Sequence, residues 1–250
     1  MREVIVKFVG DKPKLKSPIF IEGLPGVGNV GKLAADYLVD ETKAKLFAII
    51  YSKHLPPQVF VDEEGVIKQA DNRLYYLEKP ELLILCGDYQ GLTPEGQYEL
   101  ADAVLEIAEQ FKVKRILTLG GYGVGRMVIK PRVIGATTSK ELVKELKNYG
   151  VAFPKGEPGS GIIGASGLLL GLGKLRNIEG MCLMGETAGY FADPRAARAV
   201  LEILANILDI KLDFSELERK AAQIEKMTTR MRELEEAEVA RRREELGYIG

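Results

Sequence analysis

A glycine-rich segment near the N-terminus carries the residue spacing with the clearest chemical meaning in this sequence. GLPGVGNVGKL, residues 23–33, follows a short apolar run and precedes a helical pattern. Gly26, Gly28 and Gly31 match G-x-G-x-x-G, and the stretch from Gly26 to Lys32 also matches G-x-x-x-x-G-K. Glycines in such a loop let backbone amides approach a phosphate at a helix N-terminus, where the helix dipole favours an anion. One interpretation is therefore a nucleotide-binding enzyme that holds phosphate in this loop.

Each of the two motifs lacks its second part. A phosphate loop of this type needs Ser or Thr after the lysine to hold magnesium, and this chain has Leu33. A dinucleotide fold needs an acid after the next strand, but the apolar run 45–52 continues into Lys53 and His54. Asp88, at the end of a later apolar run, could serve as the second acid of a nucleotide enzyme. We favour a tight strand-to-helix turn, which needs only the glycines, and expect no cofactor.

Two further glycine clusters follow, GGYGVGR at 120–126 and GEPGSGIIGASGLLLGLG at 156–173. Loops at the carboxyl ends of strands in an open α/β sheet can rim a common pocket. Few side chains with catalytic chemistry fall in these loops, and Ser166 lies in G-A-S-G rather than in G-x-S-x-G. Glu186 is the one acid without an evident structural role. We therefore predict that the glycines are mainly architectural and that the chain has no catalytic residues.

Composition and charge make several classes of site improbable. The chain has 250 residues, 35 Lys and Arg against 36 Asp and Glu, and a single histidine. The near-neutral balance predicts no nucleic-acid surface, and one histidine leaves no His-rich metal site. Cys86 and Cys182 lie in apolar runs and are predicted to be buried rather than paired. The absence of Trp with many charged residues favours a thermophilic source.

No apolar run is long enough to cross a bilayer, and the first residues alternate as a strand does. We therefore expect a cytoplasmic protein with no membrane partner.

The elements that must position these residues alternate along the first 213 positions. Strands buried on both faces are predicted by three apolar runs, at residues 45–52, 81–88 and 180–186. Thr93-Pro94 and Asp193-Pro194 each place a capping side chain before a proline, which is typical of a helix start. Short β-rich segments within 57–78 predict a small antiparallel meander. The alternation predicts a three-layer α/β/α domain over residues 1–213, with a largely parallel or mixed sheet.

Residues 214–250 have a different pattern and are predicted to form a long charged C-terminal helix with a tail. No proline or glycine occurs from Ser215 to Leu246. A narrow apolar stripe of coiled-coil type runs along this charged segment and includes Leu217, Ile224, Met231 and Leu234. Such a helix buries little by itself, so it either lies back on the domain or packs against another subunit. We favour the second arrangement and predict a homo-oligomer.

Several long segments together resemble the archaeal members of the proteasome assembly chaperone family. They are HLPPQVFVDEEG, CGDYQGLTPEGQYELADAVL, LTLGGYGVG and IIGASGLLLGLGKLRNIEGMCLMGETAGYFADPRAARAVLEIL, and the resemblance covers about residues 3–215. It implies a phosphorylase/hydrolase-like fold without the catalytic residues of those enzymes. It also implies a non-enzymatic chaperone or adaptor that forms homo-oligomers and binds 20S proteasome α-subunits through its C-terminal tail. Labels on some relatives suggest ATP-dependent ligation, so a ligase-like enzyme that uses the Gly26–Lys32 loop is one alternative. A small-molecule hydrolase or phosphorylase is another, by analogy of fold alone.

The last residues of the chain are those on which this implied binding depends. Ring-binding partners of the proteasome often end in a hydrophobic residue, a tyrosine and any residue. This chain ends in LGYIG, with the tyrosine one place earlier than in that pattern and Gly247 before it. The residues expected to contact α-subunits are Leu246, Tyr248, Ile249 and Gly250, and a frayed terminus without a role is the alternative.

Overall fold

The computed structural model describes residues 3–10, 12–156 and 161–223, and the chain divides into two compact units, Met1–Leu212 and Asp213–Gly250. Within the described residues, the first unit contains an eight-stranded sheet with the order β1-β3-β6-β7-β2-β8-β10-β9. These strands are β1 (Val4–Phe8), β2 (Ile19–Gly23), β3 (Lys45–Ser52), β6 (Asn72–Glu78), β7 (Glu81–Gly87), β8 (Arg115–Gly123), β9 (Val133–Thr137) and β10 (Glu179–Thr187). The neighbours β7, β2, β8 and β10 run parallel, whereas β1, β3, β6 and β9 pair antiparallel. The sheet is therefore mixed.

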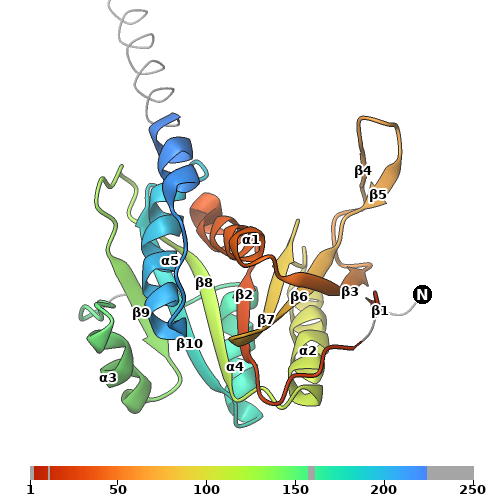
Figure 1. Cartoon of the computed structure of the whole chain (residues 1–250), viewed down its shortest axis with the longest axis horizontal. Coiled ribbons are helices and arrows are strands. Elements are labelled where there is room, and N and C mark those ends of the chain that lie inside the picture. Colours follow the sequence, from red (N-terminus) through yellow and green to blue (C-terminus); the bar gives the residue numbers. More distant parts are fainter. Residues whose placement is uncertain (1–2, 11, 157–160, 224–250) are drawn as a thin grey trace, which may run out of the picture. The chain divides into compact units, whose positions relative to one another are not determined.

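Helices cover both faces of this sheet (Figure 1). On one face, α1 (Val30–Thr42) and α5 (Pro194–Leu208) contact each other, and on the other α2 (Pro94–Gln110) contacts α4 (Ala165–Leu175). A short 3-10 turn, η1 (Val27–Asn29), precedes α1, and α3 (Lys140–Asn148) contacts β9. The three layers confirm the predicted α/β/α fold class.

The predicted helix starts at the two proline sites are confirmed. The Thr93 side chain accepts a hydrogen bond from the Gly96 amide at 3.0 Å, at the beginning of α2. Asp193 accepts from the amides of Arg195 and Ala196, both at 3.1 Å, at the beginning of α5. In each helix the cap satisfies amides that have no partner within the helix.

Two parts of the chain differ from the pattern expected from the sequence. Residues 165–173 of the third glycine cluster lie in the helix α4 instead of in a loop. A Cβ on Gly167 would lie 2.1 Å from the Ile162 carbonyl oxygen, so only glycine allows the backbone before α4 to approach this helix so closely. This close approach outweighs the low helix propensity of glycine. Within 57–78, β4 (Val59–Val61) and β5 (Ile67–Gln69) form a separate two-stranded sheet, while β6 joins the main sheet.

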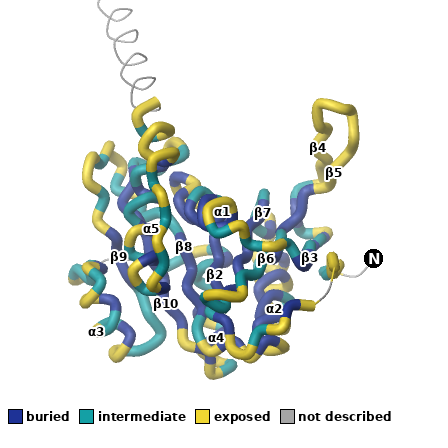
Figure 2. Tube along the Cα trace, in the orientation of Figure 1, coloured by how far each residue is buried: buried dark blue, intermediate teal, exposed yellow. Residues whose placement is uncertain are grey.

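The core of the first unit lies between the central strands and the helices, as Figure 2 shows by the buried colour of these elements. The residues of β7 from Leu82 to Cys86 are all buried, as predicted for a strand covered on both faces. Cys86 and Cys182 are free and buried, as predicted. Burial raises the pKa of the Cys182 thiol to about 12, so this thiol is inert at neutral pH.

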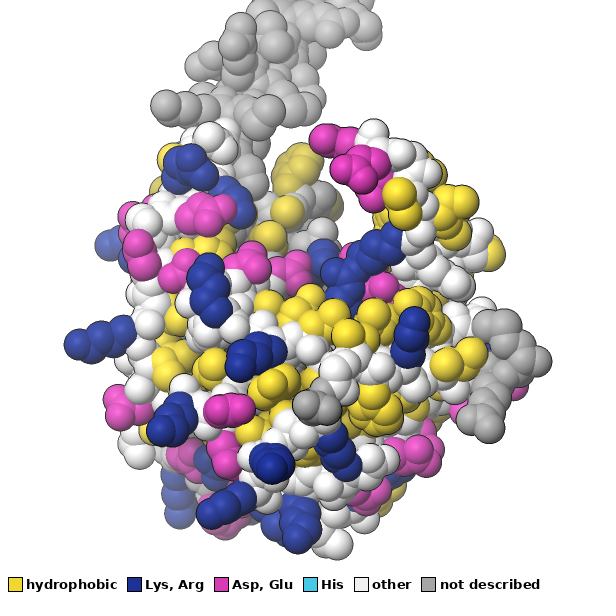
Figure 3. All heavy atoms as spheres, turned by 45° about the vertical axis from the view of Figure 1, so that its right-hand side comes forward, with side chains coloured by type: hydrophobic (Ala, Val, Ile, Leu, Met, Phe, Trp, Pro, Cys, Tyr) yellow, Lys and Arg dark blue, Asp and Glu magenta, His cyan; other side chains and the backbone are white. Residues whose placement is uncertain are grey.

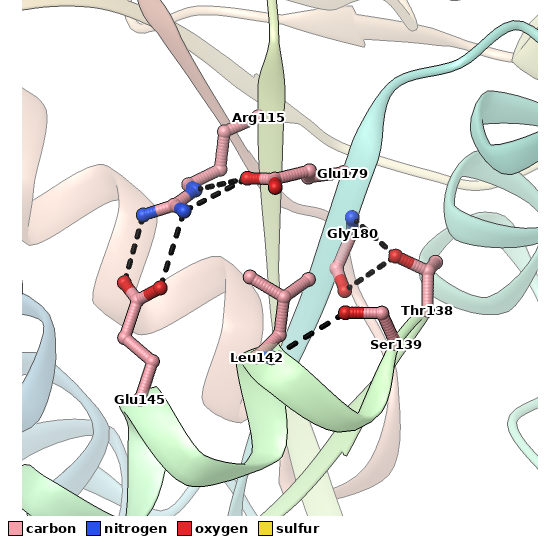
Figure 4. Close-up of polar contacts among 7 residues, drawn as sticks. All are labelled: Arg115, Thr138, Ser139, Leu142, Glu145, Glu179 and Gly180. Atoms are coloured by element: carbon pink, nitrogen blue, oxygen red, sulfur yellow. Dashed lines mark hydrogen bonds and ion pairs between the residues drawn. The ribbon is translucent and has the colours of Figure 1, made fainter.

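A network of charged and polar groups fixes α3 and β9 to the beginning of the parallel strands (Figure 4). Arg115 of β8 donates to both carboxylate oxygens of Glu145 on α3, at 2.8 and 3.2 Å. Its Nε and Nη2 also donate to Glu179 of β10, at 3.0 and 2.8 Å. The Thr138 hydroxyl accepts from the Gly180 amide at 2.9 Å, next to the start of α3. Two hydrogen bonds from one guanidinium group to one carboxylate fix the relative orientation of Arg115 and Glu145, so the network sets the position of α3.

The second unit is described only at its beginning, where residues 215–223 are helical. The amide of Ser215 donates to Asp213 at 2.9 Å, and Lys220 pairs with Glu216 one turn earlier at 2.7 Å. Of the predicted apolar stripe, Leu217 belongs to this helix, and Ile224, Met231 and Leu234 lie outside the described residues. The full length of the helix stays a prediction.

Candidate functional site

The loops that follow β2, β7, β8 and β10 lie at one edge of the sheet, which we name the carboxyl edge. Parallel strands place their carboxyl ends together, and ligands in open α/β sheets bind at this edge. Two of the three glycine clusters follow strands of this group, and the third leads into α4 beside it. The contacts at the carboxyl edge therefore indicate whether the glycine clusters serve close packing or nucleotide binding.

The glycines of the carboxyl edge allow backbone to pack directly on backbone. Gly28 has a φ of 61°, and a Cβ there would lie 2.7 Å from the Thr187 hydroxyl at the end of β10. A Cβ on Gly121 would lie 2.2 Å from the Val27 carbonyl oxygen, and one on Gly31 would lie 2.1 Å from that of Leu119. The loops after β2, β8 and β10 thus pack against one another. This geometry supports the architectural interpretation of the glycines.

Lys32, the lysine of the possible phosphate motif, is engaged by groups of the protein itself. Its Nζ donates to the Gly87 carbonyl oxygen at 3.0 Å and lies 3.0 Å from a carboxylate oxygen of Asp36. Asp88, the candidate second acid, is 3.9 Å from the same Nζ. In a phosphate loop this lysine must reach the phosphates. Here it connects α1 to the end of β7, which favours a structural role.

Glu22 is a buried carboxyl group that sequence reasoning missed. The Ser166 hydroxyl, at the beginning of α4, donates to its Oε2 at 2.8 Å, and the Leu24 amide donates to its Oε1 at 3.0 Å. Burial raises the pKa of Glu22 to about 7. The signal in the sequence was an acid within the otherwise apolar strand IFIEG. Ser166 therefore anchors α4 to β2 through this carboxyl group.

Gln90, which follows β7, is a second contact that the sequence did not reveal. Its Nε2 donates to the Pro25 carbonyl oxygen at 2.6 Å, and its Oε1 accepts from the Ala165 amide at 2.9 Å. One side chain thus joins the first glycine loop to the N-terminus of α4. Without a partner, the amide of Ala165 would be one of the unsatisfied donors of that helix.

Glu186 now has a structural role. Its Oε1 accepts from Arg132 Nε at 2.9 Å, and its Oε2 accepts from the Arg132 amide at 3.0 Å. The hydrogen bond from the Arg132 side chain holds the pKa of Glu186 below its ordinary value. Because Arg132 immediately precedes β9, the carboxylate anchors the segment between β8 and β9 to the end of β10.

The outside of the carboxyl edge carries exposed apolar side chains. Every loop of this edge contributes at least one, and the set is Val27, Leu92, Met127, Ile129, Ile163, Tyr190 and Phe191. Ile163 is 92% exposed, which is unusual for a side chain of this type. Several exposed apolar groups on neighbouring loops are typical of a protein-interaction surface. The edge thus uses side chains such as Gln90 and Glu186 to join its loops inside and presents apolar groups outside, while Asp88 Oδ2 is buried there without a hydrogen bond.

The described residues contain no group of three or more His, Cys, Asp or Glu side chains placed to hold a metal ion. Over the same residues, no helix combines the length and hydropathy needed to span a bilayer. The residues expected to contact a partner, Leu246, Tyr248, Ile249 and Gly250, lie outside the described part of the chain.

A three-layer α/β/α domain with exposed apolar side chains along its carboxyl edge has the features of a protein-interaction domain. The chain belongs to the PAC2 family, whose model matches residues 20–232. The resemblance stated from the sequence is thereby confirmed.

Relatives from two archaea are similar over nearly the whole chain. The Methanocaldococcus jannaschii protein MJ1210 is 39% identical over 257 residues, which cover 100% of this chain and 99% of that protein. The crystal structure of Pyrococcus furiosus PbaB, an archaeal proteasome activator, has a TM-score of 0.88 at 38% identity and covers 93% of this chain and 100% of its own. That of Pyrococcus furiosus PbaA, an archaeal homologue of proteasome-assembly chaperone, has a TM-score of 0.79 at 32% identity and covers 99% and 98%.

Proposed function

We propose that this chain is a non-enzymatic, cytoplasmic assembly chaperone or activator of the proteasome that binds 20S α-subunits. The observation that carries the proposal is the similarity to PbaB, at 38% identity and a TM-score of 0.88 over 93% of the chain. PbaA, named as a homologue of proteasome-assembly chaperone, adds a second relative of the same kind at 32% identity. The descriptions of both relatives refer to the proteasome, which supports it as the partner.

The pairing of polar groups at the carboxyl edge supports a non-enzymatic role. Lys32, Glu22 and Glu186 each form hydrogen bonds or ion pairs with groups of the protein itself. An active site needs a nucleophile, a base and a stabilising donor around one reacting atom. The contacts of these three side chains are instead those of anchors between elements, and no observation favours a second proposal based on the Gly26–Lys32 loop.

Two segments of the C-terminal unit are proposed to make the contacts with other chains. Leu217, Ile224, Met231 and Leu234 form the stripe through which copies of the chain would associate. Leu246, Tyr248, Ile249 and Gly250 would dock on α-subunits. The support for both is the sequence pattern, in which apolar residues stand on an otherwise charged segment.

The experiment measures binding of the full chain to purified 20S α-subunits by surface plasmon resonance. The variant Tyr248→Ala/Ile249→Ala is expected to bind at least about tenfold more weakly, because anchor residues carry most of the free energy of binding. Glu244→Ala/Glu245→Ala is the matched control on the same segment and should bind within about twofold of the unchanged chain. Equal affinity of the Tyr248/Ile249 variant and the control would reject the tail contact.

A second measurement separates the proposal from a nucleotide enzyme. The melting temperature of the full chain should not change when ATP or NAD is added, because a ligand stabilises only a protein that binds it. An increase of several degrees with either nucleotide, or turnover of ATP, would contradict the non-enzymatic role.

A further inference from the structure

The hairpin of β4 and β5 projects from the first unit and is exposed along its whole length (Figure 2). Its strands pair Val59 with Gln69, Phe60 with Lys68 and Val61 with Ile67. An isolated hairpin of two strands is only marginally stable in water. Contacts with the rest of the first unit must therefore stabilise this hairpin. One of its faces makes such contacts and the other does not.

One face of the hairpin is fixed to the loop that follows β7. The Phe60 ring stacks on the Tyr89 ring, with centroids 6.3 Å apart and an interplanar angle of 14°. Gln58, which precedes β4, donates to the Tyr89 hydroxyl. On the same face Lys68 lies 3.9 Å from Asp88. These contacts set the direction in which the hairpin projects.

The opposite face is apolar and uncovered. Val59, Val61 and Ile67 point away from the first because side chains alternate along a strand, and they are 51%, 63% and 67% exposed. Exposed β-branched residues side by side on an edge hairpin favour contact with another chain.

The tip of the hairpin adds negative charge to this apolar face. The turn contains Asp62, Glu63 and Glu64, and acidic side chains gather at the end of the projecting hairpin in Figure 3. Asp62 has a structural role, since its side chain accepts from the amides of Glu64 and Val66 at 3.0 and 2.8 Å. Among the described residues, Glu63 and Glu64 have no ion-pair partner. A partner surface should therefore be basic, with apolar groups beside the charge.

The chain itself carries such a surface, which we name the lysine hollow. It has a volume of about 240 Å³ and is lined by Lys43, Lys45, Tyr76, Leu77, Glu78 and Lys79. The lining thus combines three lysines and one glutamate with an aromatic and an aliphatic residue. Lys45 extends over the Tyr76 ring, with its Nζ 6.0 Å from the ring centroid. Over the described residues, Lys43 and Lys79 form no ion pair, so their charge is available.

We propose that the β4–β5 hairpin of one copy docks on the lysine hollow of a second copy of this chain. Glu63 and Glu64 would approach the ammonium groups of the hollow, while the apolar face of the hairpin would lie against Tyr76 and Leu77. Opposite charges on the two surfaces select the orientation, and the apolar residues supply the area removed from water.

The positions of the two surfaces make this contact intermolecular. The hairpin connects to the end of β3 and the beginning of β6, whereas the hollow lies at the beginning of β3 and the end of β6. Seven strand residues separate the two ends, which corresponds to about 24 Å. Surfaces at opposite ends of one chain meet head to tail between copies, and such contacts form rings when the rotation closes.

Site-specific cross-linking tests the contact directly. Two single variants of the full chain, Glu64→Cys and Lys79→Cys, are mixed and air-oxidised, and disulfide-linked chains are separated by electrophoresis. The native thiols Cys86 and Cys182 are buried and do not compete. A linked product that contains one copy of each variant is expected. The control mixture pairs Glu64→Cys with Glu106→Cys, an exposed position on α2. A yield no higher than in this control would overturn the proposal.

Charge reversal in the same assay tests whether the two surfaces recognise each other. Glu63→Lys on the hairpin variant, or Lys45→Glu on the hollow variant, should each slow cross-linking by about tenfold. When both reversals are present in one mixture, the opposite charges face each other again and the rate should recover. Failure to recover would overturn the pairing. Glu99→Lys, at an exposed position of α2, is the control for net charge and should leave the rate unchanged.

This inference goes beyond the proposed function and does not depend on it. Binding of the same variants to α-subunits is measured separately. Loss of cross-linking therefore leaves the α-subunit proposal standing, and loss of α-subunit binding leaves the hairpin contact standing.

Discussion

The carboxyl edge and the β4–β5 hairpin both lie at the margins of the first unit and both expose apolar side chains, but they use their charged groups in different ways. At the carboxyl edge, charged and amide side chains such as Lys32, Gln90 and Glu186 contact the protein's own backbone. At the hairpin, Glu63 and Glu64 have no ion-pair partner among the described residues, and one apolar face is open. The charged and amide groups of the first region hold the fold, whereas the carboxylates of Glu63 and Glu64 remain available for contact with another chain.

The comparison also shows that a match to a sequence motif does not by itself identify a functional site. The glycines and Lys32 match a nucleotide motif, yet Gly28 and Gly31 are explained by close approaches to β10 and β8, and Lys32 by its contact with the end of β7. The hairpin matches no nucleotide-binding or catalytic motif. The packing of the first unit nevertheless gives no reason for its exposed apolar face. A group that the fold already uses is a weaker candidate for function than one that it leaves unused.

The largest expected effect is at a glycine of the carboxyl edge. Gly31→Ala would place a Cβ 2.1 Å from the Leu119 carbonyl oxygen, so α1 must move away from β8. We expect the free energy of unfolding to fall by about 3 kcal/mol. Gly171→Ala, on an open side of α4, is the matched control and should gain up to about 1 kcal/mol. Urea unfolding measures both, and equal stability of the two variants would break the packing interpretation.

An intermediate, pH-dependent effect is expected at Glu22. Its folded pKa of about 7 lies above the ordinary value of 4.5, so the folded state binds more protons between these values. The contribution of Glu22 to stability is complete below pH 4.5 and is lost as the pH rises through 7. Glu22→Gln cannot ionise, so its stability relative to the unchanged chain should rise by up to about 3 kcal/mol between pH 4.5 and 8.

Urea unfolding at pH 4.5 and pH 8 measures this difference. Burial also raises the pKa of Asp71, to about 6, but this group is present in both proteins and cancels in the comparison. Glu99→Gln, on the exposed side of α2, should show no such change. A constant difference across pH would mean that the Glu22 carboxyl group is not desolvated as the structure indicates.

The smallest effect on stability is expected at the hairpin. Ile67→Ala removes an exposed side chain and should change the free energy of unfolding by less than about 0.5 kcal/mol. The same substitution at the fully buried Ile84 of β7 should cost about 2–5 kcal/mol. Urea unfolding at low protein concentration compares them. A cost above about 1 kcal/mol for Ile67→Ala would show that the fold itself uses this face, and the contrast between the two regions would disappear.

Much of the fold could be predicted from local signals. Apolar runs such as 81–88 and capped prolines such as Asp193-Pro194 are contained in a few neighbouring residues, and they predicted buried strands and helix starts. The helix α4 was missed because its glycines indicate a loop, and only packing against the sheet explains them. The resemblance to the family depended on long segments and was confirmed over residues 20–232.

The sequence by itself determined the α/β/α class, the buried cysteines and the doubtful status of the nucleotide motif, because these follow from residue type and short spacing. The tertiary structure decided the contacts between distant positions. Ser166 reaches Glu22 across 144 positions of the chain, and Gln90 reaches Ala165 across 75. The face of the hairpin that stays exposed was decided in the same way, by Tyr89 and Asp88 on the neighbouring strand's loop. Burial and pairing depend on which segments meet in space, and a local pattern does not contain that information.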